Sequence, residues 1–157
     1  MEQHYSVLIV GVGFMGTNHA IVLLDQQKLH DNVRLVGVAD INAGNLAAFS
    51  QSYPHIPTFL LNENTTVADV IRQTGATAIA DVTNTNAHPG VIKSALSVPD
   101  AIHTVFQEKP IAVTLNDADE MAKLITTQNI TYSMDSIMMH SPIWKDFEEA
   151  LDDQQTP

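Results

Sequence analysis

The sequence predicts an α/β fold with a doubly wound, mostly parallel sheet and helices on both faces. Short apolar runs alternate with longer stretches in which apolar residues recur at helical spacing. A glycine-rich turn directly joins the first apolar run to the first helical stretch. Strands separated by helices of this length are connected by right-handed crossovers, which place helices on both sides of a parallel sheet.

Twelve elements are expected along the 157 residues. The strands are short runs rich in apolar residues, typical of strands buried in a parallel sheet; they are expected at 6–10, 33–39, 58–61, 76–82, 103–107 and 130–134. The helices follow the strands and carry apolar residues three or four positions apart; they are expected at 15–28, 43–52, 65–73, 88–96, 114–128 and 142–152.

Local signals support several of these boundaries. The third strand is very short, so we expect it near an edge of the sheet. Thr65 or Thr66 can cap the helix that follows, and Gly75 ends it. Pro110 stops the fifth strand, and Pro142 stands where a proline opens a helix.

Composition excludes several classes of function. Seven lysines and arginines against 18 aspartates and glutamates give a formal net charge of -11, which opposes binding to nucleic-acid phosphates or to anionic lipid. The absence of cysteine excludes disulfides, a thiol nucleophile and cysteine-ligated metals. No apolar run reaches the ~18–20 residues of a membrane span, and the amino terminus lacks the features of a signal peptide. A cytoplasmic protein is expected.

The turn after the first strand has the pattern G-x-G-x-x-G, formed by Gly11-Val12-Gly13-Phe14-Met15-Gly16. In a dinucleotide-binding turn, Gly11 permits the tight bend, Gly13 lets the backbone approach a pyrophosphate, and Gly16 lets helix and strand pack closely. Backbone N–H groups and the helix dipole then bind the phosphates, so an acidic protein can still hold an anionic cofactor. The alternative is an ordinary strand–helix turn.

An acidic residue follows at the expected distance. Asp40 ends the second strand, 24 residues after Gly16, where a carboxylate can bond the ribose hydroxyls of the cofactor. It would also repel the 2′-phosphate of NADP, and residues 41–45 contain no arginine or lysine to neutralise that phosphate. The sequence therefore predicts NAD as the cofactor.

These motifs resemble the glucose-fructose oxidoreductase/inositol dehydrogenase/MocA (Gfo/Idh/MocA) family of dehydrogenases. The resemblance rests on the glycine turn followed by His19, on Val38-Ala39-Asp40, on Asp81-Val82-Thr83 with His88, and on Glu108-Lys109-Pro110. It implies a Rossmann domain at residues 1–140. Residues 141–157 would be a final helix and tail leading to a C-terminal substrate domain that the chain lacks.

The resemblance also implies roles for individual residues. Thr83, Asn84 and His88 would lie beside the cofactor, and Glu108 would contact the nicotinamide ribose region. Lys109 would bond the substrate hydroxyl or carbonyl and assist proton transfer. The implied activity is an NAD-dependent dehydrogenase that acts on a polyol, a sugar or a similar hydroxylated small molecule.

Two other classes remain open on sequence grounds. The chain could be a non-catalytic NAD(H)-binding regulatory module or an inactive fragment. None of its seven histidines stands in a metal-binding motif, so no metal site is expected, and His19 is expected to pack beneath the glycine turn. An apolar group between Met134 and Phe147 could cover the sheet or form a homo-oligomeric contact.

Overall fold

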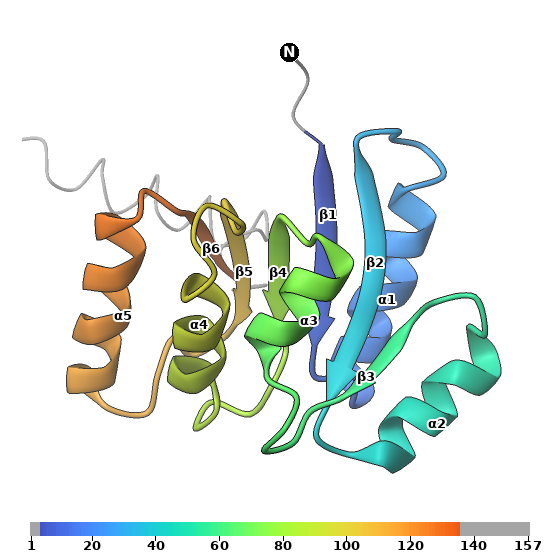
Figure 1. Ribbon diagram of the computed structural model, residues 1–157, viewed down its shortest axis with the longest axis horizontal. Coiled ribbons are helices and arrows are strands. Elements are labelled where there is room, and N and C mark those ends of the chain that lie inside the picture. The colour runs from blue at the N-terminus through green and yellow to red at the C-terminus, as the bar shows by residue number, and fades with distance from the viewer. Residues whose placement is uncertain (1–3, 136–157) are drawn as a thin grey trace, which may run out of the picture.

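The fold is known from a computed structural model that describes residues 4–135. These residues form one six-stranded sheet in the order β3-β2-β1-β4-β5-β6, in which all neighbouring strands are parallel (Figure 1). The strands are β1 (Tyr5–Val10), β2 (Val33–Asp40), β3 (Thr58–Leu60), β4 (Ala78–Asp81), β5 (Thr104–Glu108) and β6 (Thr131–Asp135). The helices are α1 (Phe14–Gln26), α2 (Ala43–Ser52), α3 (Val67–Thr74), α4 (His88–Leu96) and α5 (Leu115–Thr127).

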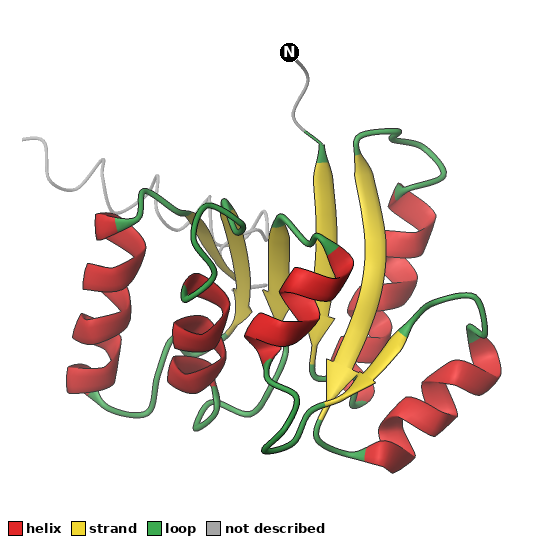
Figure 2. Cartoon of the chain, viewed as in Figure 1, coloured by secondary structure: helices red, strands yellow, loops and turns green. Residues whose placement is uncertain are grey.

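The helices cover both faces of the sheet, which confirms the predicted doubly wound fold. Helices α3, α4 and α5 stand side by side over one face, while α1 and α2 belong to the other (Figure 2). Each face has its own apolar core. The core under α1 and α2 contains Ala20, Leu24, Leu46 and Phe49, and the core under the other three helices is built around residues such as Ile71, Ile92 and Met121.

Most predicted elements are confirmed, with small differences at their ends. The predicted ranges of α2 and α4 match the structure, and β3 lies at the sheet edge as expected. Thr66 caps α3 in a capping box with Asp69, and Gly75 ends that helix at a φ of 66°. The predicted strand 76–82 is shortened to Ala78–Asp81.

Strand β4 begins later than expected because Thr77 bonds β1 through its side chain as well as its backbone, outside the regular strand pairing. The Thr77 hydroxyl accepts a hydrogen bond from the backbone N–H of Ser6, and the Thr77 N–H donates to the Ser6 carbonyl. The regular pairing with β1 therefore begins at Val7 and Ala78.

Some expectations fall on residues that the structure does not describe. The domain boundary at residue 140, the helix at 142–152 and the apolar residues from Ile137 to Phe147 lie outside the described residues. Met134, the first of the apolar group, is described and is partly exposed on β6. Among the described residues, no helix combines the length and the apolar character needed to cross a membrane.

The topology creates one crevice at the carboxyl ends of the strands. Strand β1 is central: the chain leaves it toward β2 on one side, and β4 pairs with it on the other. The connections on the two sides of β1 run over opposite faces of the sheet. They therefore leave a crevice between them at this edge, which is where open α/β sheets bind ligands. Four residues that the sequence singles out lie at this edge, namely Gly11, Asp40, Asp81 and Glu108.

Candidate functional site

The glycine turn after β1 is packed so tightly that two of its glycines cannot carry a side chain. A Cβ atom on Gly11 would lie 2.7 Å from the Val82 carbonyl oxygen, and the φ of Gly11 is 89°. A Cβ on Gly16 would lie 1.9 Å from the Gly11 carbonyl oxygen. A Cβ on Gly13 would have no atom within 4 Å. Gly11 and Gly16 are therefore needed for packing, whereas Gly13 leaves open space beside the backbone.

The first turn of α1 faces this open space without a side-chain cap. The helix begins at Phe14, and its N-cap residue, Gly13, has no side chain that could bond the free N–H groups. The side chains of Phe14 and Met15 are 83% and 41% exposed, so they do not cover the turn. The backbone N–H groups of the first turn and the positive end of the helix dipole are therefore available to an anion.

The Asp40 carboxylate is fixed against the glycine turn. Its Oδ2 accepts hydrogen bonds from the backbone N–H of Val12 at 2.8 Å and from the side-chain amide of Asn45 at 3.1 Å. Its Oδ1 accepts from the backbone N–H of Asn42 at 2.8 Å. A carboxylate offers about four acceptor positions, so this buried group retains capacity for one further donor such as a ribose hydroxyl.

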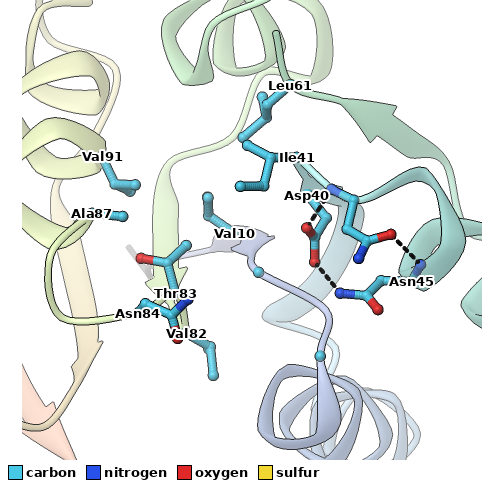
Figure 3. A pocket seen from close by; sticks show the side chains of 13 residues that line it. Val10, Asp40, Ile41, Asn45, Leu61, Val82, Thr83, Asn84, Ala87 and Val91 are labelled. Atoms are coloured by element: carbon cyan, nitrogen blue, oxygen red, sulfur yellow. Dashed lines mark hydrogen bonds between the residues drawn. The ribbon is translucent and has the colours of Figure 1, made fainter.

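A cavity of about 360 Å³ lies at this edge of the sheet (Figure 3). Figure 3 shows Ile41 and Leu61 on one side and Ala87 and Val91 on the other, with Asp40 and Asn45 at one end. The apolar pairs can hold a flat aromatic ring, while the carboxylate and the glycine turn suit a sugar and its phosphates. The cavity is also lined by Val10, Gly11, Gly13, Asn42, Val82, Thr83 and Asn84.

Five of the predicted site residues are thus brought together at one cavity, whereas the lining does not include Val12, Phe14, Met15, Gly16, His88, Glu108 or Lys109. Gly11, Gly13, Asp40, Thr83 and Asn84 line the same cavity. The His88 side chain does not line it: it is completely buried at the start of α4, where its ring nitrogens lie 3.0 and 3.1 Å from two backbone carbonyl oxygens.

His19 does not pack beneath the glycine turn, contrary to the sequence expectation. Its Nε2 lies 3.0 Å from Oε1 of Glu108 and 3.7 Å from Oδ2 of Asp135, and its ring meets Phe106 edge-on at 5.4 Å. The reason is helical spacing: three residues after Gly16, α1 turns this position toward the carboxyl ends of β5 and β6. The sequence motif gave no indication of this contact because Glu108 is 89 residues away.

The three ligand atoms of His19, Glu108 and Asp135 lie within 4.8 Å of one another. That spacing could admit a cation, but the hydrogen bond between His19 and Glu108 already joins two of the three groups. These three side chains hold the end of β5 against α1. They therefore fix the position at which the chain leaves the sheet after β5.

Lys109 follows β5 directly and is exposed at the edge of the crevice. Its backbone N–H donates to Oε2 of Glu108 at 3.3 Å, and the Lys109–Pro110 peptide bond is cis. Within residues 4–135, Lys109 forms no ion pair. Its ammonium group is therefore available to a ligand that enters from the open side of the crevice.

A buried polar layer lies beneath this edge on the α4 side. The Asp81 carboxylate accepts hydrogen bonds from the hydroxyl and the backbone N–H of Thr83 at 2.6 and 3.1 Å. Gln107 donates to the Ile111 carbonyl at 2.8 Å and accepts from the Tyr132 hydroxyl at 2.9 Å. Sequence reasoning missed Gln107 and Tyr132, since no motif marks them.

Burial shifts the pKa of two side chains in this layer, Asp81 and Tyr132. Burial raises the pKa of the Asp81 carboxyl above its usual value, while the hydrogen bonds from Thr83 and the charge of His88 act in the opposite direction. Burial, assisted by the charge of Asp81, raises the pKa of the Tyr132 hydroxyl to about 12. Tyr132 is therefore a neutral hydrogen-bond donor at physiological pH.

The family model of oxidoreductases with an NAD-binding Rossmann fold, Gfo/Idh/MocA, matches residues 5–136. The chain belongs to this family. The match covers the whole sheet and the glycine turn, and it confirms both the predicted family and the predicted cofactor, NAD. No curated protein sequence matches the chain.

Solved structures of this family share the fold. A myo-inositol 2-dehydrogenase from Lactobacillus plantarum superposes with a TM-score of 0.76 at 24% identity over 96% of this chain and 42% of its own. A scyllo-inositol dehydrogenase from Lactobacillus casei, solved with NAD(H) and scyllo-inositol, gives 0.78 at 18% identity over 96% and 42%. A UDP-N-acetylglucosamine 3-dehydrogenase from Acidithiobacillus ferrooxidans gives 0.72 at 23% over 95% and 44%. The chain thus spans less than half the length of these relatives.

Proposed function

We propose that this chain is the NAD-binding part of a dehydrogenase that transfers a hydride between nicotinamide and a hydroxylated carbon of a polyol, sugar or similar compound. The observation that carries the proposal is the position of Lys109, which follows β5 at the same sheet edge as the glycine turn and Asp40. The inositol and sugar dehydrogenases that share the fold support this class of substrate.

The described residues suit the adenosine diphosphate half of the cofactor. The N–H groups at residues 13–16 would bind the pyrophosphate, and the free space beside Gly13 would let it approach the backbone. Asp40 would accept a ribose hydroxyl with its remaining capacity. Ile41 and Leu61 on one side, and Val91 on the other, would enclose the adenine ring.

The chemistry at the other end requires a proton carrier. When bound, NAD supplies the hydride acceptor, but oxidising an alcohol also releases the hydroxyl proton. The exposed Lys109 ammonium can bond the substrate oxygen and exchange that proton with it. Glu108 would hold the backbone of this turn in place, because it bonds both the Lys109 N–H and the His19 ring.

Turnover measured by the appearance of NADH tests this proposal. A protein in which this chain is followed by a C-terminal substrate domain is supplied with NAD and a panel of inositols and aldoses. We expect NADH formation with at least one of them, and a loss of about 10²–10⁴-fold in Lys109→Ala, as is typical when a proton-transfer group is removed. Lys123→Ala, which removes an exposed lysine from α5, is the matched control and should retain activity. NAD binding without turnover would instead favour a regulatory module.

A further inference from the structure

His88 stands where two loops of the candidate site meet. It is the first residue of α4, and its side chain is completely buried. Nδ1 lies 3.0 Å from the carbonyl oxygen of Pro110, and Nε2 lies 3.1 Å from the carbonyl oxygen of Thr83. One carbonyl belongs to the turn that carries Lys109, and the other belongs to the loop that lines the cofactor cavity.

Both partners of the ring are acceptors, and this fixes its chemistry. A carbonyl oxygen only accepts hydrogen bonds, so each ring nitrogen must carry a proton to bond its partner. A neutral imidazole has a single N–H and would place the lone pair of its other nitrogen against a carbonyl oxygen. Only the imidazolium form satisfies both contacts at the observed distances.

One buried carboxylate interacts with the ring. Asp81, at the end of β4, is completely buried, and its Oδ2 has no hydrogen-bond partner among residues 4–135. A buried carboxylate oxygen without a partner is costly, and a neighbouring positive charge compensates it. The interaction between Asp81 and His88 is attractive. Tyr132 is the other titratable group of this layer, and it stays neutral.

We propose that His88 is a positioning residue: in its doubly protonated form it ties the Thr83 loop of the cofactor cavity to the Pro110 carbonyl of the Lys109 turn. Gln107 supports the same turn one residue later through the Ile111 carbonyl. The catalytic meaning of this link rests on the proposed function, since it would set the position of Lys109 relative to NAD. The link itself is a property of the chain without any ligand.

Nuclear magnetic resonance of the ¹⁵N-labelled full chain, without NAD, tests the link directly. At slightly acidic pH, we expect two ring N–H signals from His88, both protected from exchange with water. Both signals should be lost in His88→Gln and retained in His103→Gln, which removes an exposed histidine just before β5. A ring with one protonated and one bare nitrogen under these conditions would overturn the proposal.

The pH response of the two loops provides a second readout that a purely structural histidine would not produce. When the ring loses a proton, one carbonyl is released, so amide signals of the Thr83 loop and those of Lys109 and Ile111 should shift together in the wild type. The same titration of His88→Gln should lack this common step, while circular dichroism confirms that the variant is folded. Loops that shift independently, or a common step that persists in His88→Gln, would overturn the link. Neither readout requires NAD, so failure of the proposed function would leave both results interpretable.

Discussion

The carboxylate of Asp40 accepts a hydrogen bond from the backbone N–H of Val12 at 2.8 Å. This contact joins the end of β2 to the glycine turn that follows β1, two segments 28 residues apart. It places the negative charge that would select a ribose directly beside the N–H groups that would bind phosphate. The two parts of the proposed dinucleotide site are therefore joined directly in the chain without any ligand.

Removing the Asp40 carboxylate should weaken NAD binding and relax the discrimination against NADP. The loss of a hydrogen bond to a charged group costs about 1.5–3 kcal/mol, so we expect Asp40→Ala to weaken NAD by roughly 10- to 100-fold in a calorimetric titration. The affinity for NADP should fall less, because the repulsion of its 2′-phosphate is also removed. Asp25→Ala makes the same change of charge at an exposed position on α1 and should leave both affinities unchanged. Equal losses for the two cofactors in Asp40→Ala would contradict the assigned role.

A methyl group on Gly13 should affect the cofactor and not the fold. Its Cβ would have no neighbour within 4 Å, so we expect the free energy of unfolding of Gly13→Ala to stay within about 1 kcal/mol of the wild type. The methyl group would stand where the pyrophosphate approaches the backbone, and NAD affinity should fall at least tenfold. Gly90→Ala on α4 also has open space around its Cβ and is the matched control. Unchanged affinity in Gly13→Ala would exclude the glycine turn as the phosphate site.

Gly16 should show the opposite behaviour. Its Cβ would lie 1.9 Å from the backbone oxygen of Gly11, and the backbone there has no room to yield without moving the strand–helix junction. Overpacking of this kind costs about 1–3 kcal/mol, and we expect Gly16→Ala to lie at the upper end of that range in urea unfolding. A variant as stable as the wild type would mean that α1 can shift away from β1.

The buried Asp81 should make stability depend on acid pH in an unusual direction. Its pKa is raised in the folded state, mainly by burial, so the folded chain binds the proton more tightly than the unfolded chain. Wild-type stability should therefore fall, relative to Asp81→Asn, as pH rises from about 3.8 toward the raised pKa. Chemical unfolding of both proteins across this range measures the difference. The raised pKa would be contradicted if the difference in free energy of unfolding between the two proteins stayed constant with pH. It would also be contradicted if the wild type became more stable relative to Asp81→Asn as pH rises.

The sequence predicts the fold well because its signals are local, and the adenosine half of the proposed site rests on equally local signals. The glycine turn, Asp40 and the alternation of strands and helices each lie within a short segment, and the parallel sheet then brings the segments to one edge. The contacts of His19 with Glu108 and of Tyr132 with Gln107 could not be predicted. They join residues 89 and 25 positions apart whose partners depend on the rotation of a helix and on which face of a strand a side chain occupies.

His88 shows how a residue that a motif marks can have an unexpected role. The resemblance places it beside the cofactor, and in the structure it is the first residue of α4. Its side chain, however, turns inward to two backbone carbonyls. A motif therefore fixes the position of this residue in the chain, but the direction of its side chain follows from the packing of α4 against the sheet.

Backbone amide chemical shifts of the wild-type chain, followed while NAD is added, would locate the cofactor most directly. We expect the largest changes at residues 11–16 and 40–45, with smaller changes near Thr83 and Val91, the residues around the cavity. A titration that leaves those amides unmoved at saturating NAD, or that moves only residues remote from them, would show that the crevice at the carboxyl end of β1 does not hold the dinucleotide.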